Sequence, residues 1–274
     1  MMYRSAREQD ISVLCELWNQ NFGMSAENAQ RILTEVAELE NVYLAEEEGQ
    51  IISVLAAIPV TMRQLPGVYF YGAVTQKEWR HKGKMAGLLE YTKQQQTLKG
   101  RGYGVVVPRS QHAAQFWKKQ GFEPYVQLRR VDRNIRRNLW AQANFDSITA
   151  VRLGQLREKY APNAVLLPQN GLVAEIHAMY SHGATTVETD KGYGVFFEKG
   201  DILEFTELFA QSDFDAELLL EAARERTGLE KAQIVLSENS EICLGEGQME
   251  EYALACFWAV QAPSTDGYMH FMLD

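Results

Sequence analysis

Hydrophobic positions follow helical and extended spacings in turn along the first half of the chain. A short strand opens the chain, and a helix follows between Asp10, its expected N-cap, and Gly23, because apolar residues recur there every three or four positions. A second helix begins near Ser25. The remaining elements are a hairpin at 42–46 and 51–60, strands at 68–74, 105–107 and 125–131, and helices from 85 and at 111–120.

The second half repeats much of this order without detectable sequence identity. Helices are expected at 169–182 and 214–227, and strands at 184–189, 193–198, 202–209, 232–237, 252–260 and 267–273. An arginine-rich segment, 129–137, lies between the two series. We therefore predict two α/β domains of related topology, residues 1–137 and residues 138–274.

Composition places the chain among ordinary globular proteins. Of 274 residues, 46% are hydrophobic and 23% are charged, and no stretch approaches the roughly 18 apolar residues of a membrane span. The N-terminus has no apolar signal segment, and the three cysteines are widely spaced without a CxxC motif. These features predict a cytoplasmic protein without a membrane segment, a disulfide framework or a metal site.

The net charge of −9 hides a difference between the halves. Residues 1–137 contain 19 Lys and Arg against 14 Asp and Glu, a formal charge of +5, whereas residues 138–274 contain 8 against 22, a charge of −14. The basic half suits an anionic ligand, and the acidic half either faces something cationic or is simply solvated.

The segment 71–89 has the pattern of a phosphate-binding turn. It predicts a strand, a turn and a helix whose first turn is basic and contains Gly83. Unpaired amides at a helix N-terminus favour a phosphate, glycine allows close approach, and Arg80, Lys82 and Lys84 add positive charge. The alternative is a solvated basic turn that binds nothing.

Two motifs resemble those of the GNAT superfamily of N-acyltransferases. Its acetyl-CoA-binding motif, Arg/Gln-x-x-Gly-x-Gly/Ala, is similar to Arg80-His81-Lys82-Gly83-Lys84-Met85, in which Met85 departs from the general pattern. A methionine at this position is similar to the motif of the multi-lobed branch, which includes the aminoglycoside-acetylating, intracellular-survival type enzymes. A second family signature is similar to the segment from Ser110 through Trp117 to Phe122. The resemblance covers about residues 1–131.

The resemblance implies a GNAT fold with a mixed central sheet and flanking helices, followed by a second GNAT-like lobe. An amine would attack the thioester of acetyl-CoA directly. The amides of Val74 and Thr75 would orient the cofactor and stabilise the oxyanion, and the pyrophosphate would lie on the amides of His81 to Met85. Ser110 and Trp117, in the second signature, are expected at the cofactor as well.

The acid and the base are harder to assign. The family's usual general acid is a tyrosine at the position of Trp117. The proton for the leaving thiolate would then come from another hydroxyl, such as that of Tyr125 or Tyr71, or the thiolate would leave without a proton. For the base, the carboxyl terminus of the multi-lobed branch suggests Asp274 and its terminal carboxylate. The alternative is an exposed, frayed terminus.

These observations predict an acetyl-CoA-dependent N-acetyltransferase that acts on a primary amine of a small cationic molecule. The second half has acidic residues at its strand-to-helix junction, 209–217, so only the first half is expected to bind coenzyme A. A non-catalytic acyl-CoA-binding or sensing protein is the main alternative. Nucleic-acid binding by 129–137 is disfavoured because no stacking-aromatic motif accompanies the arginines. A homo-oligomer is compatible with the sequence.

Overall fold

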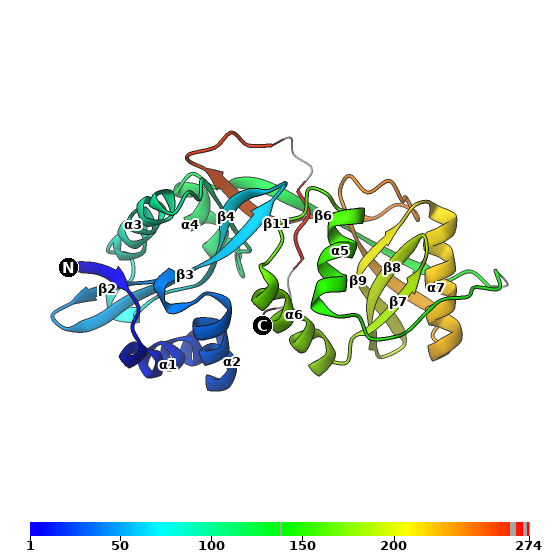
Figure 1. The fold of residues 1–274 in the computed structure, drawn as a ribbon, viewed down its shortest axis with the longest axis horizontal. Helices are drawn as coiled ribbons and strands as arrows, with labels where there is room; N and C mark the ends of the chain where they lie inside the picture. The colour runs from blue at the N-terminus through cyan, green and yellow to red at the C-terminus, as the bar shows by residue number, and fades with distance from the viewer. Residues whose placement is uncertain (138, 264–266, 271–272, 274) are drawn as a thin grey trace.

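One continuous sheet of 11 strands runs through the molecule (Figure 1). The computed structural model describes residues 1–137, 139–263, 267–270 and 273. The strand order is β1-β2-β3-β4-β5-β11-β6-β10-β9-β8-β7. The strands are β1 (Met2–Ser5), β2 (Val42–Glu47), β3 (Gln50–Met62), β4 (Leu65–Thr75), β5 (Tyr103–Val106), β6 (Glu123–Asn134), β7 (Thr185–Thr189), β8 (Gly192–Lys199), β9 (Ile202–Ala210), β10 (Lys231–Ser237) and β11 (Gln248–Phe257).

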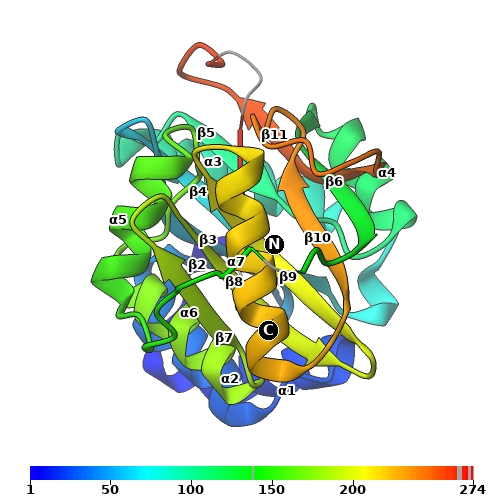
Figure 2. The same ribbon diagram turned by 90° about the vertical axis from the view of Figure 1, so that its right-hand side faces the viewer.

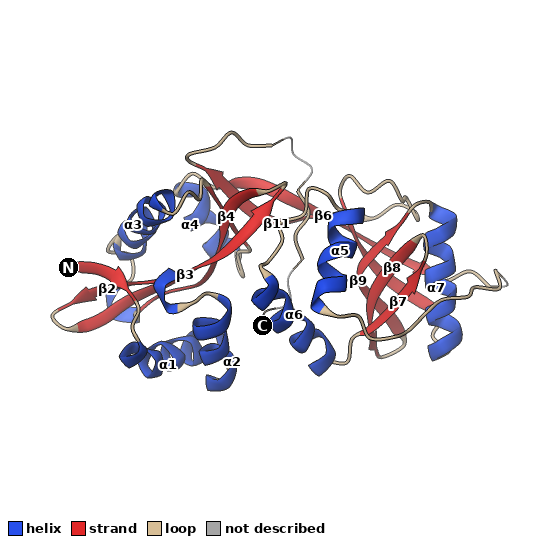
Figure 3. Cartoon of the chain, viewed as in Figure 1, coloured by secondary structure: helices blue, strands red, loops and turns tan. Residues whose placement is uncertain are grey.

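Helices cover both faces of the sheet, so the predicted α/β fold class is confirmed (Figure 3). In the first half α1 and α2 lie on one face and α3 and α4 on the other; in the second half α7 lies across β8 and β9 (Figure 2). The helices are α1 (Ile11–Phe22), α2 (Ala26–Arg31), which continues as a π-helical turn (Ile32–Val36), α3 (Lys84–Leu98), α4 (Gln111–Lys119), α5 (Ala150–Tyr160), α6 (Gln169–Ser181) and α7 (Asp213–Thr227).

The two halves share one order of elements. Three antiparallel strands, a helix and a parallel strand occur as β2-β3-β4-α3-β5 and again as β7-β8-β9-α7-β10. Two helices precede each set, α1 and α2 in the first half and α5 and α6 in the second. The helix α5 was not predicted, because Gly154 and the buried, charged Arg157 interrupt its helical pattern.

The halves also exchange strands. β11 comes from the second half but pairs antiparallel with both β5 and β6, and β6 comes from the first half but pairs antiparallel with β10. A cut at residue 137 would therefore not separate two complete sheets. We keep residues 1–137 and 138–274 as the proposed domains, each completed by a strand of the other.

One hydrophobic cluster joins the halves. It contains Leu14 and Trp18 from α1, Leu153 from α5 and Met179 from α6, all buried. Two further clusters lie under α3 and α4 and under α7. Burial of this kind is the main stabilising term of the fold.

Several local expectations need correction. Asp10 precedes α1, but its carboxylate binds the Arg4 guanidinium at 2.6 Å and the Arg7 amide at 2.8 Å instead of capping that helix. The strand expected at 252–260 spans 248–257. Of the strand expected at 267–273, the described residues form only an isolated bridge between Tyr268 and Ala164. Gly23 ends α1 with φ +70°, as predicted.

Candidate functional site

Strands β4 and β5 part soon after they meet. Their parallel pairing joins Val68 to Gly104 and Tyr69 to Val105, whereas β4 continues to Thr75. Gly72 and Ala73 together oppose one residue of β3, which is a β-bulge, and Gly72 has φ +60°. A bulge that starts with a left-handed glycine bends its strand, so it turns the end of β4 away from β5.

A groove lies along this opening. Its wide part, about 580 Å³, adjoins the start of α3, and its narrow part, about 170 Å³, lies between β4 and the segment that follows β5. Four residues line both parts and make them continuous: Phe22, Ala73, Ala113 and Trp117.

The end of β4 presents one backbone amide to the groove edge. The Gln76 amide donates to the Ile52 carbonyl at 2.9 Å, so Ile52 and Gln76 form a hydrogen-bonded pair of the ladder. The next pair, Ser53 and Thr75, is then of the non-hydrogen-bonded type, and the Thr75 amide points away from β3. By the same alternation the Val74 amide points toward β3. Of the two amides predicted to stabilise the oxyanion, Thr75 has the suitable direction.

The first turn of α3 has the backbone expected for anion binding. Gly83 is its N-cap with φ +71°, and the preceding turn contains His81 with φ +60°. The first amides of a helix have no intrahelical acceptor and lie at the positive end of its dipole. Nothing lies within 4 Å of the position that a Gly83 side chain would occupy, so a ligand has room to approach. Gly83, Lys84 and Met85 all line the wide part of the groove.

Two of the three predicted phosphate-binding side chains have other partners. The Arg80 guanidinium donates to the Thr75 carbonyl at 2.9 Å and to Asn21 Oδ1 at 2.7 Å. Lys84 Nζ lies 2.6 Å from the Glu47 carboxylate and lowers the pKa of that group. Lys82 Nζ lies over the ring of Trp79 at 5.1 Å. The backbone amides, with Lys82, are therefore the better candidates for contact with an anion.

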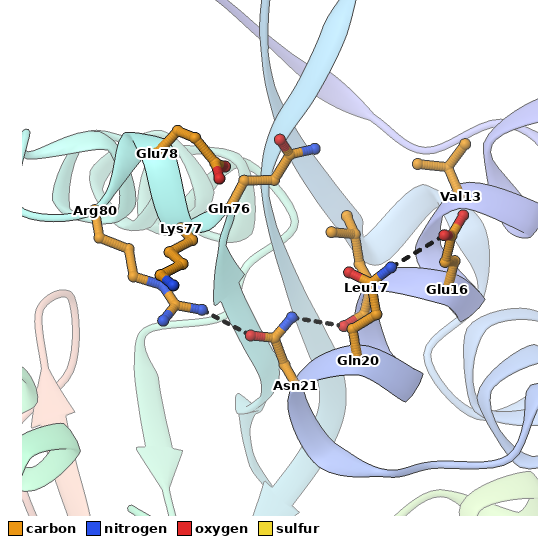
Figure 4. A pocket seen from close by; sticks show the side chains of 9 residues that line it. All are labelled: Val13, Glu16, Leu17, Gln20, Asn21, Gln76, Lys77, Glu78 and Arg80. Carbon is orange, nitrogen blue, oxygen red and sulfur yellow. Dashed lines mark hydrogen bonds between the residues drawn. The ribbon is translucent and has the colours of Figure 1, made fainter.

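A polar surface depression of about 650 Å³ adjoins the groove (Figure 4). Arg80 and Asn21 line both, and Asn21 is held in turn by a hydrogen bond from its amide to the Leu17 carbonyl, 2.8 Å. Arg80 thus connects the end of β4 to α1.

The second signature forms α4, beside the groove. Ser110 caps this helix by accepting a 3.2 Å hydrogen bond from the Ala113 amide. Trp117 is buried, with its ring stacked on Phe70 at 5.8 Å and edge-on to Phe122 at 4.9 Å. The position at which the family has an acidic hydroxyl therefore holds an apolar ring that lines both parts of the groove.

The predicted acids and base fall in different places. Tyr71 lines the narrow part of the groove. Tyr125 lines neither part, and its hydroxyl donates to Met62 Sδ at 3.2 Å within the core, so its position argues against a role as the acid. Asp274 lies outside the described residues.

Among the residues of the narrow part that the sequence did not indicate are three polar ones, Tyr69, Arg109 and Tyr252. Tyr69 precedes the segment that carries the motif, and Arg109 directly precedes the second signature. Tyr252 arrives on the exchanged strand β11, which no local pattern indicates. No carboxylate lines the narrow part within the described ranges.

The corresponding junction in the second half is occupied by acids. Asp213 Oδ1 accepts from the Cys243 amide at 2.7 Å, and Asp215 accepts from the Ser212 hydroxyl at 2.6 Å at the start of α7. These carboxylates take the place that a phosphate would need.

The described part of the chain contains no group of three or more His, Cys, Asp or Glu side chains arranged to hold a metal ion. Among the same residues, no helix combines the length and apolar character required to cross a membrane.

The first half of the chain is similar to a known domain family. Residues 2–125 match the family model of the acetyltransferase (GNAT) domain. No curated protein matches the chain in sequence.

Three solved structures share the fold over most of the chain. A GCN5-related N-acetyltransferase from Kribbella flavida has TM-score 0.75 and 14% identity, and the match covers 93% of this chain and 71% of that one. A probable N-acyltransferase from Enterococcus faecalis has TM-score 0.75 and 10% identity, with coverages of 94% and 72%. Eis1 from Mycobacterium abscessus has TM-score 0.71 and 11% identity, with coverages of 94% and 74%. At these identities the likeness shows the fold alone.

Proposed function

We propose that this protein transfers an acetyl group from acetyl-CoA to a primary amine. The match of residues 2–125 to the acetyltransferase (GNAT) domain supports the proposal. The observation that carries the proposal is the groove between β4 and β5, with free helix amides and the outward Thr75 amide both on its wide part, which continues into the narrow part. The pyrophosphate would lie on the first turn of α3, and the thioester would reach the parting of the strands.

The Thr75 amide would then stabilise the oxyanion formed when the amine attacks the thioester carbonyl. The thiolate of coenzyme A is a tolerable leaving group because a thiol has a pKa near 8.5. Of the two tyrosines predicted as possible acids, Tyr71 is the one that lines the narrow part. The proposal that Asp274 accepts the amine's proton rests on the family resemblance alone.

The acceptor class is a small cationic molecule. The support is the charge of −14 on residues 138–274, although part of it is used internally. Arg133 and Arg136 both contact Glu217, and Arg130 contacts Glu250, so the arginine-rich segment is neutralised by carboxylates of the second half. That pairing also removes support for nucleic-acid binding by these arginines.

Trp117 supports a second candidate function, a non-catalytic acyl-CoA sensor. Its ring cannot supply the proton that a tyrosine hydroxyl supplies, and positioned acids contribute about 10²–10⁴-fold to rate. The two candidates share the cofactor and differ in turnover.

Calorimetric titration with acetyl-CoA tests the cofactor site. We expect wild type to bind, Gly83→Glu to lose binding, and Gly83→Ala to retain most of it. The alanine variant carries the same backbone strain at φ +71° without the anion. Gly100→Glu, at φ +77° with open space around it, is the control for a charge elsewhere.

Thiol release across a panel of primary amines then separates enzyme from sensor. Faster turnover of cationic amines than of neutral ones is expected. A folded wild type that does not bind acetyl-CoA would contradict the proposal at its first step. Binding without turnover of any amine would favour the sensor.

A further inference from the structure

The second half has a parting of strands of its own. β9 and β10 pair in parallel from Ile202 and Lys231 to Phe205 and Ile234, and the two strands then run on to Ala210 and Ser237. A cavity of about 530 Å³ lies beyond that point. It is the counterpart of the narrow groove in the first half, because each follows three antiparallel strands and a helix in the same order.

The correspondence extends to single residues. Phe22 is the last residue of α1 and lines the groove of the first half, and Tyr160 is the last residue of α5 and lines the cavity of the second. The repeat therefore preserves an open site although its lining has changed.

The new lining lacks the phosphate-binding features of the first half. Asp213 and Asp215 stand at the start of the adjacent helix α7, and Glu241 lines the cavity itself. A phosphate group would meet like charge on that side. Lys159, whose Nζ lies over the Tyr160 ring at 4.4 Å, also lines the cavity and balances the charge of Glu241. A lining with no net charge fits an uncharged ligand better than a phosphate.

Polar side chains and an aromatic ring line the cavity together. Within the part of the chain that the structure describes, the side chains of Gln211, Ser237, Ser240 and Glu241 make no hydrogen bond although all four line the cavity. Phe209, half-buried, lines it too, with Tyr193 stacked behind at 5.5 Å. Amides and hydroxyls both donate and accept, which matches a ligand whose own groups are hydroxyls. An aromatic ring matches a ligand with one apolar face.

We propose that this cavity binds a neutral monosaccharide. Phe209 packs against the apolar face of the sugar ring, and Gln211, Ser240 and Glu241 bind its hydroxyls. Small-molecule sites combine apolar walls with a few polar groups that fix orientation in the same way. This site is separate from the acetyl-CoA groove and does not depend on the proposed function.

Saturation-transfer NMR on the full chain tests the proposal, with glucose, galactose and mannose as probes at millimolar concentration. At least one sugar should receive saturation, and acetyl-CoA should not displace it. Ser240→Trp, which fills the cavity, should abolish the signal, and Gln211→Ala should weaken binding several-fold. Ser181→Trp, at an exposed position on the last residue of α6, is the matched control and should leave binding unchanged.

Three outcomes would overturn the proposal. The first is that folded wild type transfers saturation to none of the sugars. The second is that the saturation-transfer signal persists in Ser240→Trp, and the third is that acetyl-CoA displaces the sugar. The phosphorylated probe glucose 6-phosphate should bind more weakly than glucose, and tighter binding of it would contradict the proposal that the ligand is uncharged. Thermal unfolding of each variant shows whether it is folded, and acetyl-CoA titration of the same samples reports on the first site independently.

Discussion

The indole N–H of Trp18 donates a 2.9 Å hydrogen bond to the carbonyl of Gly72, and the same indole fills the space beside that glycine. A side-chain carbon at position 72 would lie 2.3 Å from the ring. α1 therefore holds the bulge that turns β4 away from β5.

Gly72→Ala should disturb both the fold and the groove. The left-handed backbone and the clash together should lower the free energy of unfolding by about 2–4 kcal/mol. Acetyl-CoA affinity should fall as well because the bulge positions the end of β4. Urea unfolding and calorimetry measure the two effects. Gly49→Ala, at φ +78° with nothing within 4 Å, should show the backbone strain alone; equal effects of the two variants would refute the role given to Trp18.

Arg80→Ala should weaken acetyl-CoA binding by about 5-fold and lower the free energy of unfolding by about 1–2 kcal/mol. Its two hydrogen bonds fix the Thr75 carbonyl and Asn21, and a hydrogen bond contributes about 1 kcal/mol net. Lys77→Ala is the matched control, since Lys77 lines the same depression (Figure 4). Similar losses in the two variants would indicate a general charge effect instead of positioning.

Trp117→Tyr should raise kcat if the enzyme lacks a positioned acid. A phenol at this position could protonate the leaving thiolate, which is worth up to about 100-fold for a partly aligned group. The smaller ring should also lower stability, because Trp117 packs against Phe70 and Phe122. Trp117→Phe makes the same packing change without the hydroxyl. A rise in kcat in both variants, or in neither, would remove the argument about the acid.

Arg157→Met should lower the free energy of unfolding by about 3–5 kcal/mol, because two buried carboxylates lose their partner. Arg157 binds Glu175 through two bonds of 2.7 Å and also contacts Glu207, and all three side chains are buried. Arg152→Met, in an exposed pair with Glu188, should change stability by less than about 1 kcal/mol. Chemical denaturation of both variants provides the comparison.

Stability should fall as the pH drops below about 6.5, partly because of His270. Burial lowers the pKa of this imidazole in the folded protein, so the unfolded chain binds a proton first. The contribution is present above the unfolded pKa and is lost as the pH falls through the folded one. His270→Gln should therefore have a shallower loss of stability between about pH 7 and pH 5. An unchanged slope would assign the loss to carboxylates alone.

The local pattern of the sequence predicted most of the elements because each has its own spacing and punctuation. Gly23 and Gly83 have a left-handed backbone, which glycine adopts readily, at a helix end and at the turn before α3. The helix end and the turn could therefore be predicted from these glycines. The helix α5 could not be predicted in this way, because Arg157 interrupts its apolar face and binds partners on α6 and β9.

Long-range features of the site could not be predicted in this way. The placement of Tyr252 depends on where β11 inserts, and no property of residues 248–257 indicates β5 and β6 as partners. Likewise, the sequence around Arg80 predicted that its side chain contacts a phosphate. In the structure this side chain donates to Asn21, 59 positions earlier in the chain.

The place of β11 between β5 and β6 has a consequence for synthesis of the protein on the ribosome. The first half cannot complete its sheet until residue 257 has emerged, so β5 keeps an unpaired edge while more than half of the chain is still to be made. Such late closure between distant segments slows folding. The sheet beside the groove is therefore completed late, although the motifs of the groove are translated early.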